Sequence, residues 1–99
     1  GPAYFFYWME AMIAAGQQLG LSEQVARDLT LQTALGAAQM AITGGEHPSK
    51  LRQNVTSPNG TTQAALESMA QHQVGELIQQ ALFAAAQRSE ALSSVLERD

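Results

Sequence analysis

Apolar residues in this chain recur at the spacing of α-helices, and they nowhere alternate as they would in a half-buried strand. The residues between them are good helix formers, chiefly Ala, Leu, Met, Gln and Glu. Glycines and prolines divide the chain into five such segments. The pattern therefore predicts an all-α fold with helices over 2–19, 22–43, 48–54, 61–71 and 74–96.

The first predicted helix begins with six bulky side chains in a row, from Tyr4 to Met9. Because consecutive residues lie about 100° apart around a helix, six positions cover its whole circumference. Such a turn must be buried on several sides. In so short a chain, this density favours a core that is shared with another chain. The alternative is a purely intramolecular core.

The second predicted helix carries a stripe of small side chains, formed by Ala34, Ala37, Ala38 and Ala41. Small side chains allow another helix to approach closely. Gly36 lies on another stripe of the same helix, with Val25, Leu29 and Met40, and a glycine inside a helix costs about 1 kcal/mol relative to alanine. Gly36 thus indicates close packing of this helix, unless it is simply a tolerated weak position.

Composition narrows the classes of function. Charged residues make up 14% of the 99 residues, against about 25% in an average soluble domain. The missing ionic surface must be neutral and polar, or a partner must cover it. The net charge is −4 and the basic residues are scattered, whereas a protein surface that binds nucleic acid needs clustered Lys and Arg residues. No apolar run is long enough to span a membrane. We therefore expect neither nucleic acid nor membrane as a partner.

The sequence lacks the residues and motifs that several kinds of catalytic or binding site require. The chain has no cysteine, hence no disulfide, no thiolate metal site and no cysteine nucleophile. Neither His47 nor His72 has a second histidine three or four residues away, so we expect no metal site. Neither a G-x-G-x-x-G motif nor a phosphate-binding P-loop occurs, so we expect no nucleotide site in this chain.

The densest polar cluster is the segment 56–62, with the sequence Thr-Ser-Pro-Asn-Gly-Thr-Thr. It holds a Pro-Asn-Gly turn and four hydroxyl groups, and Thr61 or Thr62 is expected to cap the fourth helix. Free backbone N–H groups at a helix N-terminus attract anions, and hydroxyls add donors, so a carboxylate or phosphate would fit. Ordinary turn and capping chemistry accounts for the same residues. No general base is present, which favours binding over catalysis.

Short motifs along the chain, taken together, match one family. In order they include Gly1-Pro2-Ala3-Tyr4-Phe5-Phe6, Gly20-Leu21-Ser22, Leu35-Gly36-Ala37-Ala38, Val55-Thr56-Ser57-Pro58 and Gly60-Thr61-Thr62. They resemble the C-terminal domain of the pyrroline-5-carboxylate reductases over nearly all 99 residues. The resemblance also makes the opening Gly1-Pro2 native sequence and not the remnant of a tag.

The resemblance implies a fold, an activity and partners. The chain would be a single domain over 1–99, a bundle of about five helices interleaved with a second copy as a homodimer, and dimers of the family build larger rings such as decamers. An N-terminal Rossmann domain, absent from this chain, would bind NADPH or NADH. The whole enzyme would be cytoplasmic and would reduce 1-pyrroline-5-carboxylate to L-proline. This chain alone would be inactive.

The resemblance also assigns roles within the polar cluster. Ser57, Gly60 and Thr61 would hold the substrate carboxylate, and Thr62 would reach the ring nitrogen as the catalytic residue. Asn59 departs from the family, which commonly has glycine there. Because asparagine tolerates a left-handed backbone better than other non-glycine residues, we expect the loop to keep its shape.

One alternative function stays open at this point. A helical interaction module that stands alone, without ligand or catalytic role, would show the same helices and the same low charge. Upstream sequence with a strand, a G-x-G-x-x-G turn and a helix would decide between the two.

Overall fold

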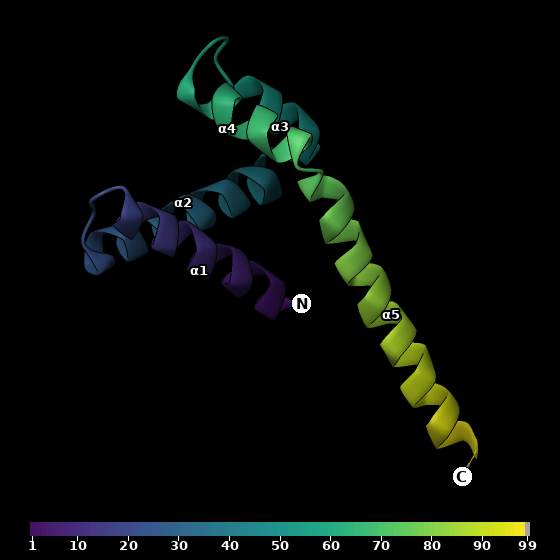
Figure 1. The fold of residues 1–99 in the computed structure, drawn as a ribbon. Coiled ribbons are helices and arrows are strands. Elements are labelled where there is room, and N and C mark those ends of the chain that lie inside the picture. Colours follow the sequence, from purple (N-terminus) through teal and green to yellow (C-terminus); the bar gives the residue numbers. More distant parts are fainter. Residues whose placement is uncertain (99) are drawn as a thin grey trace. The chain divides into compact units, whose positions relative to one another are not determined.

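The structure is a computed structural model that describes the backbone of residues 1–98 and the side chains of residues 1–93. In this part of the chain the secondary structure consists of α-helices, and no strand is present (Figure 1). The helices are α1 (Pro2–Gln18), α2 (Glu23–Gly44), α3 (Pro48–Asn54), α4 (Thr61–Gln71) and α5 (Val74–Arg98). The predicted all-α class is confirmed, and every expected helix is found.

The chain divides into two units, Gly1–Gln53 and a second that begins at Asn54. In the first unit, α1 and α2 lie side by side and run antiparallel (Figure 1). The sharp reversal between them depends on Gly20, whose φ of +108° suits glycine alone. The N–H of Gly20 donates to Gln17 C=O and the N–H of Leu21 to Gly16 C=O, both at 3.0 Å, which together form a Schellman motif.

Both ends of α2 follow from its sequence. Ser22 has an extended backbone, and its side-chain oxygen accepts the N–H of Val25 at 3.2 Å, as expected of an N-cap. Glu23 follows in the first turn, near the positive end of the helix dipole. The helix ends at Gly44, and its C-cap residue is Gly45, whose φ of +72° lies in the left-handed region.

The tightest contact of the first unit joins α1 to α2 at Gly16. A Cβ atom at Gly16 would lie 2.9 Å from the Cβ of Ala26, closer than two carbon atoms can pack. Ala26 is 2% exposed and Thr30 is 6% exposed, and they are the only buried residues among those described. The core of the first unit is therefore very small.

Gly16→Ala is expected to lower the free energy of unfolding by about 1 kcal/mol, because overpacking outweighs the gain in helix propensity. Neither Cβ atom can rotate away from the clash with Ala26. The matched control is Gly75→Ala on α5, where a new Cβ would meet nothing within 4 Å. Urea denaturation of both variants measures the difference. Equal stabilisation by the two substitutions would contradict a tight contact at Gly16.

The second unit contains α4 and α5, joined by the short turn at His72 and Gln73. The backbone of His72 donates to Ser68 C=O at 3.1 Å, and His72 Nδ1 lies 2.8 Å from the same oxygen. Gln73 has a φ of +58° and carries the chain into α5. None of the side chains described for residues 54–93 is buried.

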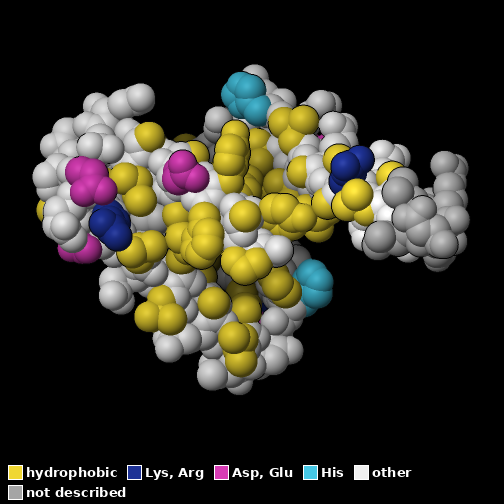
Figure 2. Space-filling view, turned by 90° about the horizontal axis from the view of Figure 1, so that it is seen from below, with side chains coloured by type: hydrophobic (Ala, Val, Ile, Leu, Met, Phe, Trp, Pro, Cys, Tyr) yellow, Lys and Arg dark blue, Asp and Glu magenta, His cyan; other side chains and the backbone are white. Residues whose placement is uncertain are grey.

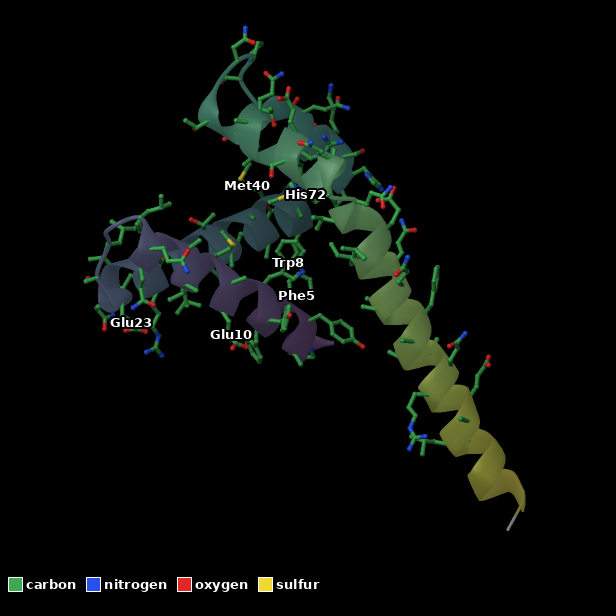
Figure 3. The ribbon with its side chains drawn as sticks, in the orientation of Figure 1. Phe5, Trp8, Glu10, Glu23, Met40 and His72 are labelled. Atoms are coloured by element: carbon green, nitrogen blue, oxygen red, sulfur yellow. The ribbon has the colours of Figure 1, made fainter. Side chains whose placement is uncertain are left out.

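Large apolar side chains are exposed on both units. Figure 2 shows apolar side chains of all sizes over much of the face in view. The six bulky residues from Tyr4 to Met9 form the aromatic turn of α1, and in it the exposed fractions are 68% for Phe5, 59% for Phe6 and 75% for Tyr7. The first unit therefore does not bury this turn by itself, and a core shared with another chain stays the prediction. Trp8, which is half-buried, projects from α1 on the side of α2, and Glu10 projects on the opposite side (Figure 3).

Gly36 on α2 has open space beside it. A Cβ atom at Gly36 would meet nothing within 4 Å. In the first unit, α1 therefore does not make the close approach that Gly36 indicates.

Candidate functional site

The polar cluster folds as a tight turn followed directly by α4. The N–H of Gly60 donates to Ser57 C=O at 3.3 Å and closes the turn. Asn59, at its third position, has a φ of +61°, and Pro58 stands at its second position, as in a type II turn. The expected Pro-Asn-Gly turn is confirmed, and Asn59 adopts the left-handed backbone that glycine would adopt more easily.

The start of α4 differs from expectation in one respect. We expected Thr61 or Thr62 to cap the helix, but the N-cap is Gly60, which has an extended backbone and makes no side-chain cap. The expectation is wrong because the turn ends at Gly60, which places this residue at the cap. Glycine is acceptable there. Thr61 and Thr62 are therefore the first two residues of the helix, and neither hydroxyl serves as its cap.

Donor groups are concentrated at this end of α4. The first bond that closes a turn here runs from the N–H of Ala64 to Gly60 C=O at 3.2 Å. The N–H groups of Thr61 and Thr62 precede it and have no partner within the helix. The side chains of Ser57, Thr61 and Thr62 are exposed. The first turn contains no acidic residue, so donors and the positive end of the helix dipole face a possible anion together.

The residues assigned from the sequence are thus neighbours, but they do not offer the same groups. Ser57, Thr61 and Thr62 present hydroxyls at the surface, and Gly60 is half-buried. The N–H of Gly60 is already engaged with Ser57. A role for Gly60 in holding a ligand would therefore lie in shaping the turn. The arrangement can bind and orient a small anion, and it offers no side chain that could act as a general base.

One residue of the site was not foreseen. The side chain of Gln63, in the first turn of α4, accepts the N–H of Asn59 through Oε1 at 2.5 Å. Its Nε2 donates to Glu67 Oε1 at 2.9 Å. A Gln or Glu at the third helical position is a known signal for a side chain that reaches back over the helix start. That signal was present in the sequence.

The two histidines have local structural partners. Ser49 donates its N–H to His47 Nδ1 at 3.1 Å, and its Oγ lies 2.8 Å from the same nitrogen, so His47 supports the start of α3. Among the side chains that the structure describes, those of residues 1–93, no group of three or more His, Cys, Asp or Glu is placed to hold a metal ion. No helix in this part of the chain is long and apolar enough to cross a membrane.

Fold and site together define a class: an all-α domain that leaves its apolar helix faces uncovered and presents a hydroxyl-rich turn at one helix N-terminus. The family model for pyrroline-5-carboxylate reductase dimerisation matches residues 1–92. The chain belongs to this family, which confirms the resemblance seen in the sequence motifs.

Individual relatives agree. The chain is 56% identical over 96 residues to a pyrroline-5-carboxylate reductase of Pseudomonas aeruginosa, covering 97% of the chain and 35% of the relative. It is 48% identical over 98 residues to pyrroline-5-carboxylate reductase 1 of Bacillus subtilis, covering 99% of the chain and 33% of the relative. The chain spans about a third of the length of the curated relatives it matches.

Solved structures show the same fold. A pyrroline-5-carboxylate reductase from Coxiella burnetii matches with a TM-score of 0.88 and 47% identity, over 93% of this chain and 34% of that one. The pyrroline carboxylate reductase of Plasmodium falciparum, solved with NADP bound, matches with a TM-score of 0.89 and 33% identity, over 92% of this chain and 37% of that one.

Proposed function

We propose that the chain is the dimerisation and substrate-binding domain of a cytoplasmic enzyme that reduces 1-pyrroline-5-carboxylate to L-proline. Family membership supports the activity, and relatives three times as long leave room for a further domain. The chain has no dinucleotide-binding motif and no strand in its described part. We therefore assign the cofactor, NADPH or NADH, to an N-terminal Rossmann domain. The NADP bound to the relative from Plasmodium falciparum supports a nicotinamide cofactor.

The start of α4 is the observation that carries the substrate-binding part of the proposal. Thr61 and Thr62 occupy its first two positions with exposed hydroxyls that are not used as caps. We assign the substrate carboxylate to Ser57, Thr61 and the turn shaped by Gly60, and the ring nitrogen to the Thr62 hydroxyl. When bound, the nicotinamide supplies a hydride to the carbon of the C=N bond. The chain's task is to hold that bond in place, because orientation and charge placement lower such a barrier.

The exposed surface supports the dimer. Phe5 is 68% exposed and Tyr7 is 75% exposed in the single chain, and exposed apolar surface of this kind marks interaction sites. A second copy, interleaved with this one, would cover the aromatic turn of α1 and the face of α2 around Gly36. Rings such as decamers, built from this dimer, belong to the same proposal.

L-proline, titrated into the chain, is expected to shift the backbone amide NMR signals of Gly60, Thr61 and Thr62 at millimolar concentration. The donors at the start of α4 would bind its carboxylate. The N-terminus of α2 is the internal control, because Ser22 already caps it and its amides should not move. Pyrrolidine, which lacks the carboxylate, is the ligand control.

Shifts of equal size with proline and pyrrolidine would contradict a carboxylate site, as would the absence of any shift at Thr61 and Thr62. A helical interaction module without a ligand predicts the second of these results. The titration therefore also decides between the two functions that the sequence left open.

A further inference from the structure

Two side-chain hydrogen bonds connect the body of α4 to the turn that precedes it. Gln63 Oε1 accepts the N–H of Asn59 at 2.5 Å, and Gln63 Nε2 donates to Glu67 Oε1 at 2.9 Å. Gln63 and Glu67 are four residues apart and so lie on one face of the helix. Both ends of the half-buried Gln63 amide are therefore occupied, which holds its side chain in one orientation.

The first of these bonds reaches the residue of the turn whose backbone is hardest to hold. Asn59 has a φ of +61° without being glycine, a conformation that L-residues disfavour. The turn's own bond, from Gly60 N–H to Ser57 C=O, is long at 3.3 Å. Gln63 supplies a second restraint from a residue that is itself fixed in a helix. Without it, the N–H of Asn59 would lose this acceptor.

The choice of glutamine over glutamate suits an anionic ligand. Either residue can reach back over a helix start, and the helix dipole alone would favour glutamate in the first turn. A carboxylate at position 63 would, however, stand in the same turn as the donors proposed to bind a carboxylate. The neutral amide of Gln63 restrains Asn59 without adding charge, and the acidic group of Glu67 lies one turn further along the helix.

We infer that Gln63, supported by Glu67, is a positioning residue for the substrate carboxylate. It fixes Asn59 and thereby sets the turn 57–60 against the first turn of α4, without touching the substrate. This inference rests on the proposed function of that turn. It identifies a side chain that contributes to substrate affinity from outside the hydroxyl cluster.

Gln63→Met in the full-length reductase is expected to raise KM for 1-pyrroline-5-carboxylate about three- to tenfold, the range for the loss of one hydrogen bond. Because binding and not chemistry is affected, kcat should change less than about twofold. Hydrogen–deuterium exchange should become faster in the peptide that contains Asn59. Methionine keeps the length and the helix propensity of glutamine, so assembly should be unchanged.

The matched control is Gln71→Met at the other end of α4, whose side chain makes no hydrogen bond within the described part of the chain. It should leave KM and exchange unchanged. Glu67→Gln retains an oxygen that accepts from Gln63 and should stay near wild type, whereas Glu67→Met should raise KM. Gln63→Glu keeps an acceptor for Asn59 but adds charge, so its higher KM should fall with added salt. The higher KM of Gln63→Met should not change with added salt, because methionine adds no charge.

The outcomes separate this inference from the proposed function on which it rests. Unchanged KM and unchanged exchange in Gln63→Met, while Thr62→Ala still impairs turnover, would overturn the positioning role alone. A rise in KM that Gln71→Met reproduces would overturn it too, because the effect would then belong to the helix. If Thr62→Ala also had no effect, the proposed function itself would fail.

Discussion

Thr62→Ala is expected to lower kcat/KM of the full-length reductase about 10- to 100-fold while leaving its assembly intact. Thr62 is the second residue of α4, and its exposed hydroxyl does not cap the helix. It is therefore available to the ring nitrogen of the substrate. A hydrogen bond to a charged group contributes more binding free energy than a bond between neutral groups. A hydrogen-bonding group that stands where charge changes during the reaction acts mainly by stabilising the transition state.

Two further substitutions make the Thr62 prediction specific. Thr62→Ser keeps the hydroxyl and should retain most of the activity. Thr43→Ala removes a threonine hydroxyl from α2, where it donates to Gln39 C=O at 2.7 Å, and should leave turnover unchanged. Steady-state kinetics and sedimentation of all three variants provide the comparison. Wild-type turnover in Thr62→Ala, or an equal loss in Thr43→Ala, would contradict the role assigned to Thr62.

Phe5→Gln is expected to raise the dissociation constant of the dimer about 30-fold or more, since truncated aromatic anchors at interfaces cost about 2 kcal/mol. Phe5 is 68% exposed in the single chain, so its loss removes little of the chain's own packing. Any large effect must come from surface that a second copy covers. Sedimentation over a range of concentrations measures the constant.

The control for Phe5→Gln is Glu10→Gln on the same helix. Glu10 projects from the side of α1 opposite Trp8 (Figure 3), and its neutralisation should leave dimerisation unchanged. Identical dissociation constants for wild type and Phe5→Gln, with an intact fold, would show that the aromatic turn is not part of the interface.

Local signals made the helices predictable. Pro48 opens α3, and the Pro58-Asn59-Gly60 turn sets the start of α4, so both helices occur where the sequence placed them. These signals act over a few residues and need no tertiary information. The start of α4 was nevertheless misjudged at one residue, because the backbone of Gly60, and not side-chain preference, decides which residue is the cap.

Features that depend on distant residues were harder to predict. Nothing local distinguishes Gly16, where an added Cβ would clash with Ala26, from Gly36, where it would meet nothing in the first unit. The aromatic turn of α1 predicts that burial is needed, but the sequence does not say what covers it, and the first unit leaves it exposed. Within the site, the turn and the helix start follow from local chemistry. The specific roles of Ser57, Thr61 and Thr62 rest on the family resemblance, because hydroxyls at a helix start have several uses.

The low charge content now has a physical meaning. Charged residues make up only 14% of the chain, and large apolar side chains are exposed on α1, α2 and α5. Such surface is typical of a chain that is covered in its working state. In the proposed enzyme, a second copy covers the apolar faces, and a cofactor-binding domain faces the start of α4.

Sedimentation equilibrium of the 99-residue chain tests the central claim most directly. The claim is that this chain completes its core with a second copy of itself. The predicted result at micromolar concentration is a mass of twice 10.6 kDa, about 21 kDa, together with a helical circular dichroism spectrum. A well-folded monomer of 10.6 kDa under the same conditions would contradict it.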